Sequence, residues 1–170
     1  MVEVDIQTAS IAIASASVVV GVVYYALQLR NQNRMRQTDL LMRLYATFTS
    51  REFEEAWYKV LCLEFKDYED FVGKYGSVVS ETSTNIALSS VTSFFEGIGV
   101  LLHKKLVDID LIWELFSPPI VNTWQKCRPI VEGYRQQYGK EMPEAKNDTQ
   151  WFEYLYNEVK KRQQKGVKSG

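Results

Sequence analysis

The residues best suited to metal or acid–base chemistry are few and far apart in this chain. It has one histidine, His103, and two cysteines, Cys62 and Cys127. A di-iron site in a helical bundle needs two Glu-x-x-His pairs, whereas Glu96 precedes His103 by seven residues. Two cysteines and one histidine also leave a four-ligand zinc site incomplete. We therefore expect neither a metal nor another cofactor.

The familiar motifs of nucleotide-binding and hydrolytic enzymes are absent from the sequence as well. The chain contains no GxxxxGK[ST] loop, no GxSxG turn and no GxGxxG loop. Cys62 and Cys127 lack CxxC spacing and are interpreted as small core residues. His103, followed by two lysines, is expected to face solvent or to complement a helix dipole. These observations favour a protein that is not an enzyme.

Two charged residues stand out because their neighbours are apolar. Glu96 lies in the run SFFEGIGVLL, and Arg128 lies in the run WQKCRPIV. A carboxylate next to a hydrophobic core needs a partner, and a guanidinium group can bind it through two parallel hydrogen bonds. The sequence therefore suggests an ion pair between Glu96 and Arg128 on two neighbouring helices. The alternative is that both side chains face water.

A long apolar segment precedes these charged residues, and its nature decides where the rest of the chain lies. The segment from Ile6 to Leu29 has 24 residues and no charged side chain. As a helix it would be roughly 36 Å long, enough to cross a bilayer core of about 30 Å. A core helix of so small a domain is usually shorter, and a signal peptide begins with basic residues, whereas Glu3 and Asp5 precede this segment. We therefore predict a transmembrane helix at 6–29 rather than a core helix or a signal peptide.

The distribution of basic residues predicts the orientation of this helix. All 20 lysines and arginines follow Leu29, and Arg30, Arg34 and Arg36 come directly after it. Basic flanks mark the cytoplasmic side of a transmembrane helix, so these three arginines are expected at the inner membrane surface. We predict a single-pass protein of the cell membrane, with residues 1–5 outside and the C-terminal domain in the cytoplasm.

The part after the transmembrane helix is long enough for one domain. Residues 30–164 are expected to form a helical bundle, and residues 165–170 a flexible polar tail. This part carries all the basic residues and 19 of the 21 acidic ones, a net charge of +1. A nucleic-acid-binding protein usually has a strongly basic face, so no nucleic acid partner is expected.

The transmembrane segment has one face of small and weakly polar residues. At 100° per residue, a sector of about 100° contains the small-residue stripe, defined as Ser10, Ala14, Ser17, Gly21 and Gln28. Small side chains let helices pack closely in lipid, so the stripe predicts contact with a second copy or with another membrane protein. Two alternatives remain: the small residues are merely tolerated, or several copies line a narrow pore with them.

Helical spacing of apolar residues recurs in the rest of the chain, whereas no segment alternates in the manner of a strand. The sequence up to about Thr49 lacks a helix breaker, so one helix should continue from the bilayer. Ser50 should cap the next helix. A further helix should begin at Ser117, because Pro118 and Pro119 suit a first helical turn. The predicted fold is all-α: an N-terminal transmembrane helix that continues into a cytoplasmic antiparallel helical bundle.

Several short motifs give the chain a likeness to known proteins. FFEGIG, LVDIDL, CRPIVEGYR and WFEYL, together with the overall layout, resemble a family of small prokaryotic single-span membrane proteins with a helical cytoplasmic domain of unknown function. The resemblance covers roughly residues 90–155 and implies an architecture, but no activity.

The expected function follows from the location and the architecture. A membrane-anchored helical domain without enzyme motifs suggests an interaction or scaffold module, as an oligomer or as an accessory subunit of a membrane complex. Its expected partners are the lipid bilayer and either itself or another membrane protein. A small homo-oligomeric channel and, third, an enzyme built on the bundle are the alternatives.

Overall fold

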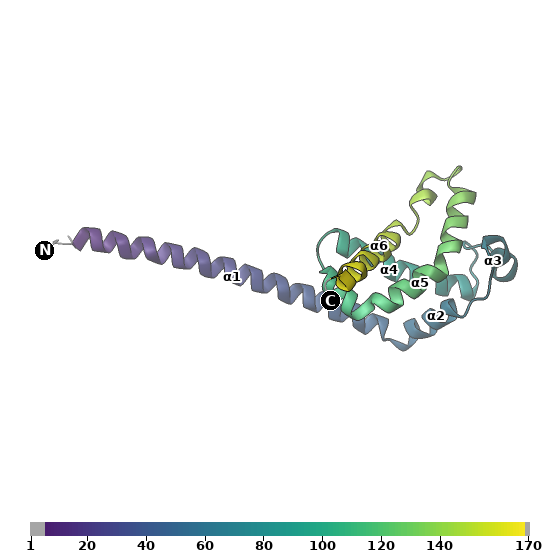
Figure 1. Ribbon diagram of the computed structural model, residues 1–170, viewed down its shortest axis with the longest axis horizontal. Coiled ribbons are helices and arrows are strands. Elements are labelled where there is room, and N and C mark those ends of the chain that lie inside the picture. Colours follow the sequence, from purple (N-terminus) through teal and green to yellow (C-terminus); the bar gives the residue numbers. More distant parts are fainter. Residues whose placement is uncertain (1–5, 169–170) are drawn as a thin grey trace. The chain divides into compact units, whose positions relative to one another are not determined.

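The computed structural model describes residues 6–168, and this part of the chain folds into six α-helices and one short 3-10 helix, without a strand (Figure 1). The predicted all-α fold class is thereby confirmed. Residues 1–5, predicted to lie outside the cell, and the last two residues of the predicted tail are outside the described range. The chain divides into two compact units, residues 1–39 and 40–170.

Helix α1 comprises Ile6–Phe48, as the absence of a helix breaker predicted. In its first part the large apolar side chains from Ile11 to Leu29 keep between 43% and 68% of their surface exposed. By length and composition, two helices among the described residues could cross a membrane: α1 and α4. They differ because about half of α4 is buried within the fold. A signal sequence passes the same test as α1.

The remaining helices belong to the second unit and begin at polar caps. Ser50 accepts a hydrogen bond from the backbone N–H of Phe53 at 3.3 Å, which confirms the predicted cap. Asp67, Thr82 and Asp108 cap the next three helices in the same way. The elements are α2 (Arg51–Leu61), α3 (Tyr68–Tyr75), α4 (Ser83–His103), α5 (Ile109–Tyr138), η1 (Pro143–Asn147) and α6 (Gln150–Lys168).

The predicted helix start at Ser117 is wrong, because α5 continues through Pro118 and Pro119. Each proline removes one N–H donor from the helix, and the carbonyl groups that lose their donors belong to Glu114 and Leu115. Both residues are exposed, so water can reach this side of the helix. On the other side, buried residues continue across the prolines. Packing of the core therefore outweighs the local stop signal.

The core lies in the second unit and includes the last turns of α1. The ring of Phe48 on α1 lies 5.3 Å from the ring of Trp57 on α2 and 5.6 Å from that of Phe116 on α5. The rings of Phe94 and Phe95 on α4 complete this cluster. Aromatic contacts of this kind bury much surface at defined angles. They fix the end of α1 against three helices of the domain.

Helix α6 completes the core from the C-terminal side. It packs against α4 and α5, while α2 packs against α4, and α3 against α5 (Figure 1). Phe152, Leu155 and Val159 of α6 have at most 1% of their surface exposed. These three residues follow the helical spacing that the sequence predicted. The helix runs on to Lys168, into the first residues of the predicted tail.

Candidate functional site

The candidate site is a pocket of about 360 Å³ next to the start of α6. Helices α4 and α5, the loop between α3 and α4, and the end of η1 surround it. Apolar and polar side chains share the wall, and two of the lining residues are acidic. The lining residues are Val78, Val79, Asn85, Leu88, Ser89, Thr92, Ser93, Glu96, Ile130, Val131, Tyr134, Asn147, Asp148 and Thr149.

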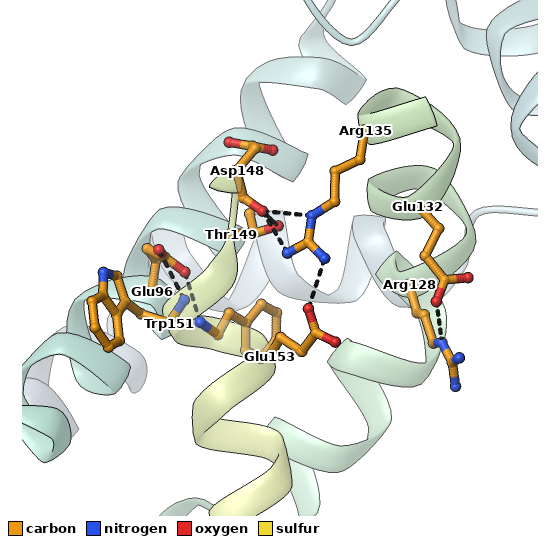
Figure 2. Close-up of polar contacts among 9 residues, drawn as sticks. Glu96, Arg128, Glu132, Arg135, Asp148, Thr149, Trp151 and Glu153 are labelled. Carbon is orange, nitrogen blue, oxygen red and sulfur yellow. Dashed lines mark hydrogen bonds and ion pairs between the residues drawn. The ribbon is translucent and has the colours of Figure 1, made fainter. Parts of the chain in front are cut away.

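Glu96 extends from α4 to the first turn of α6. Its Oε1 accepts a hydrogen bond from the backbone N–H of Trp151 at 3.1 Å, and its Oε2 accepts one from Phe152 at 2.6 Å (Figure 2). The first N–H groups of a helix have no partner within the helix, and a carboxylate also complements the positive end of the helix dipole. Glu96 therefore caps α6 from a different helix.

The neighbours of Glu96 explain why α6 can come so close to α4. A Cβ atom at Gly99 would overlap the backbone carbonyl of Trp151, so only glycine fits there. The ring of Phe95 stacks on that of Phe152, with 4.9 Å between the ring centres. The FFEGIG motif thus supplies three features that meet the start of α6: the ring of Phe95, the carboxylate of Glu96 and the space left by the missing side chain of Gly99.

Arg135 of α5 holds the segment that precedes α6. Its Nε and Nη2 donate hydrogen bonds to the backbone carbonyl of Asp148 at 3.0 and 2.7 Å, and its Nη1 donates to Glu153 at 2.7 Å (Figure 2). Only 20% of the Arg135 side chain is exposed. Such a charge-assisted fork orders both the loop and the helix that follows.

Both acidic side chains of the pocket lie in surroundings that disfavour their charge. Burial raises the pKa of the Glu96 carboxyl, against the effect of its two N–H donors, and the charge of Asp148 raises it further. Burial also raises the pKa of Asp148, while the charge of Arg135 opposes this shift. The Asp148 carboxyl thus acts on Glu96 in the same cleft, and groups with shifted pKa values in a cleft mark a candidate binding site.

Asn85 of α4 lies in the same pocket wall and is 3% exposed. Its Nδ2 donates to the backbone carbonyl of Ser77 and to the hydroxyl of Ser80, both at 2.7 Å, and more weakly to the carbonyl of Tyr75. Its Oδ1 is buried and has no hydrogen-bond partner in the part of the chain that the structure describes. An unpaired buried acceptor is costly, so it indicates a place where a donor belongs.

The predicted ion pair between Glu96 and Arg128 is wrong. Arg128 donates to Glu132, one turn further along α5, at 2.7 Å, and 59% of its side chain is exposed (Figure 2). Glu96 satisfies its carboxylate with backbone N–H groups instead. The apolar run around Arg128 belongs to the other side of α5, which the sequence spacing did not reveal for this residue.

The other residues singled out in the sequence do not join the pocket. The five residues of the small-residue stripe and Arg30, Arg34 and Arg36 lie on α1 and are exposed. His103, also exposed, lies 4.2 Å from the ring of Trp151. Cys62 is exposed rather than in the core, whereas Cys127 is buried, and burial raises the pKa of its thiol to about 12.

Three residues of the site were missed in the sequence. These residues are Asn85, Asp148 and Arg135. Their partners lie 5 to 18 residues away, in other elements, so helical periodicity carries no signal for them. One hint was available, because Arg135 falls in the same CRPIVEGYR motif that carried the resemblance.

Comparison with known proteins places the chain in a family without assigning a role to it. The sequence profile of a domain of unknown function, DUF4760, matches residues 11–159. This range includes all the motifs that meet at the start of α6. No curated protein and no solved structure matches the chain. On the profile match, which covers most of the sequence, the chain belongs to the DUF4760 family.

Proposed function

We propose that this protein is a single-pass protein of the cell membrane whose helical domain acts as an interaction or scaffold module. The observation that carries the proposal is the first part of α1, where 24 residues without a charge form one continuous helix with exposed apolar side chains. In water such a surface would be unfavourable, whereas in a bilayer it is solvated by lipid.

The basic residues after this segment support an orientation. Arg30, Arg34 and Arg36 are exposed on α1 and have no basic counterpart before Ile6. In the proposed topology these arginines lie at the inner membrane surface, the N-terminus is outside, and the helical domain is an antiparallel bundle in the cytoplasm.

The contacts of the pocket support an interaction role better than an enzymatic one. The carboxylate of Glu96 binds two backbone N–H groups, and Arg135 binds a backbone carbonyl and Glu153. These groups already have structural partners, whereas a general base needs its lone pairs for the substrate. We infer that the domain works by binding, as an oligomer or as an accessory subunit of a membrane complex.

The test determines the oligomeric mass of the protein and its co-purifying partners in a mild detergent. The full chain is purified from membranes, its mass is measured by light scattering, and co-purifying proteins are identified by mass spectrometry. A defined oligomer or a reproducible partner is expected. A monomer without a partner would contradict the interaction role. Ion flux through the reconstituted homo-oligomer would instead favour a channel.

A further inference from the structure

One face of α1 beyond the apolar segment carries no charge. Its residues follow one another at alternating steps of three and four, the spacing of the core positions of a coiled coil. This face, called the α1 seam, comprises Gln28, Asn31, Met35, Thr38, Met42 and Tyr45. We propose that the α1 seam pairs with the same seam of a second copy in a parallel, two-stranded coiled coil. The pairing rests on the proposed function, because one topology gives all copies the same orientation, and it names the partner.

The large side chains of the α1 seam are exposed in the single chain. In the first unit Met35 keeps 66% of its surface exposed, and in the second unit Met42 and Tyr45 keep 55% and 38%. Leu41, the neighbour of Met42, is buried in the helical domain, so packing of that domain occupies a different side of the helix. In the proposed topology the three seam residues follow the membrane segment, where water rather than lipid would surround them. Contact with a second copy would remove this apolar surface from water.

The charges beside the α1 seam favour a second copy in parallel orientation. In a parallel coiled coil, the side chain just before one core position meets, on the partner helix, the side chain about five residues further along. Arg34 and Asp39 occupy these two positions, and Asp39 is the only acidic residue between Asp5 and Glu52. Each copy would therefore place its Arg34 against Asp39 of the other copy. Around one helix these residues lie about 140° apart, so the same two side chains do not face each other within a copy.

The spacing of the α1 seam agrees with that of the small-residue stripe. Intervals of seven residues connect Ala14, Gly21, Gln28, Met35 and Met42. A straight helix departs from a seven-residue repeat by about 20° per heptad, so two helices keep such positions in contact by winding into a left-handed supercoil. Helices in membranes pack mostly with this same hand. One pairing can therefore extend from the lipid, where small side chains meet, to the positions beyond it, where methionine, threonine and tyrosine meet.

Disulfide crosslinking in membranes tests the pairing directly. Single cysteines are introduced into the full chain carrying Cys62→Ser, because Cys62 is exposed, whereas Cys127 is buried. Oxidation should link two copies through Met35→Cys or Thr38→Cys. It should do so at least about tenfold less through Asn33→Cys on the opposite side of α1, because a disulfide needs Cα atoms within about 7 Å. Equal linking through all three positions, or through none, would overturn the proposal.

Exchanged charges separate a contact between copies from a contact within one copy. Arg34→Glu and Asp39→Lys each place like charges opposite each other in a pair of identical copies, so each variant should associate with itself roughly tenfold more weakly than the wild type. A mixture of the two variants restores opposite charges at both contacts and should form mixed pairs, measured by co-purification through two different tags. Arg36→Glu, the same charge change at an exposed residue outside the α1 seam, should associate as the wild type does. No preference for mixed pairs would overturn the charge contact and the parallel register.

The outcomes distinguish the second copy from the broader interaction role. A different protein that co-purifies with the chain, without a disulfide between copies at Met35→Cys or Thr38→Cys, would overturn the second copy as the partner and leave the interaction role intact. A monomer without a partner would contradict both. Linked copies together with a preference for mixed charge pairs would support both.

Discussion

Glu96 caps α6 although it lies 55 residues before Trp151 in the sequence. A helix is usually capped by its own N-cap residue. A cap side chain normally binds N–H groups two or three residues ahead of it and is defined by local sequence. Here the carboxylate comes from the middle of α4, so the start of α6 exists as a capped helix only when the two helices are packed together.

The first prediction follows from this capping role. Glu96→Ala leaves the N–H groups of Trp151 and Phe152 without their acceptor, and we expect it to lower the free energy of unfolding by about 1–3 kcal/mol. Chemical denaturation in detergent measures the change. Glu114→Ala, at an exposed residue of α5, should stay within about 0.5 kcal/mol of the wild type. Similar values for both variants would mean that the cap is not needed.

The pKa of Glu96 leads to a prediction about pH. Because burial raises this pKa, the carboxyl group of Glu96 binds its proton more tightly in the folded protein than in the unfolded chain. The contribution to stability is then fully present below the ordinary value of 4.5 and is lost as pH rises through the higher folded pKa. The stability of the wild type relative to Glu96→Gln should therefore fall from pH 4.5 upward. Thermal unfolding across this range measures the difference, and a constant difference would contradict the expectation.

Two glycines of one motif give opposite predictions. A Cβ at Gly99 would overlap the backbone of Trp151, whereas a Cβ at Gly97 would meet nothing within 4 Å. We expect Gly99→Ala to cost about 1–3 kcal/mol through overpacking. Gly97→Ala should gain up to about 1 kcal/mol, because alanine favours a helix. Unfolding of the two variants side by side is the measurement, and equal stabilities would refute the close packing of α6 on α4.

At the scale of elements, local signals predicted helices better than contacts between them. The cap at Ser50 and the spacing of Phe152, Leu155 and Val159 depend on neighbours within one or two turns, and the structure confirms them. The continuity of α5 depends on burial along its far side, which no local rule contains. Arg128 shows the same limit, because an apolar run does not say which side of its helix faces water.

The prediction for the proposed transmembrane segment concerns its association. Ser17 and Gly21 lie four residues apart in the small-residue stripe, and leucine at both positions keeps the segment apolar. The double variant should enter the membrane normally but lose its oligomeric state or its partner, because the larger side chains prevent close packing. Light scattering and co-purification in detergent measure this loss.

The matched control replaces Val19 and Val23, on the opposite side of the helix, with leucine. This variant should keep the mass and the partners of the wild type. If the Ser17 and Gly21 variant also behaves as the wild type does, the stripe has no role in association and α1 is an anchor only.

At the scale of the whole molecule, the charge pattern predicts which end of the chain is cytoplasmic and which end is outside the cell. All lysines and arginines follow Leu29, so a reporter fused after Gly170 should be cytoplasmic and a tag at Met1 should be outside. Protease added to intact cells should remove the tag and leave the domain whole. Digestion of the domain would reverse the topology, and a mature chain that begins near Arg30 would identify a cleaved signal sequence.

The position of Glu96 has a further consequence during synthesis. Helix α4 has 21 residues and is apolar enough to cross a membrane, and α6, which covers it, begins 67 residues after the start of α4. In the proposed topology α1 holds the chain at the bilayer, so the newly made α4 would emerge uncovered beside lipid. An acidic residue near the middle of a helix opposes insertion by about 2.5–3.5 kcal/mol. In that topology, before α6 exists for it to cap, Glu96 would direct α4 away from the membrane and toward the fold.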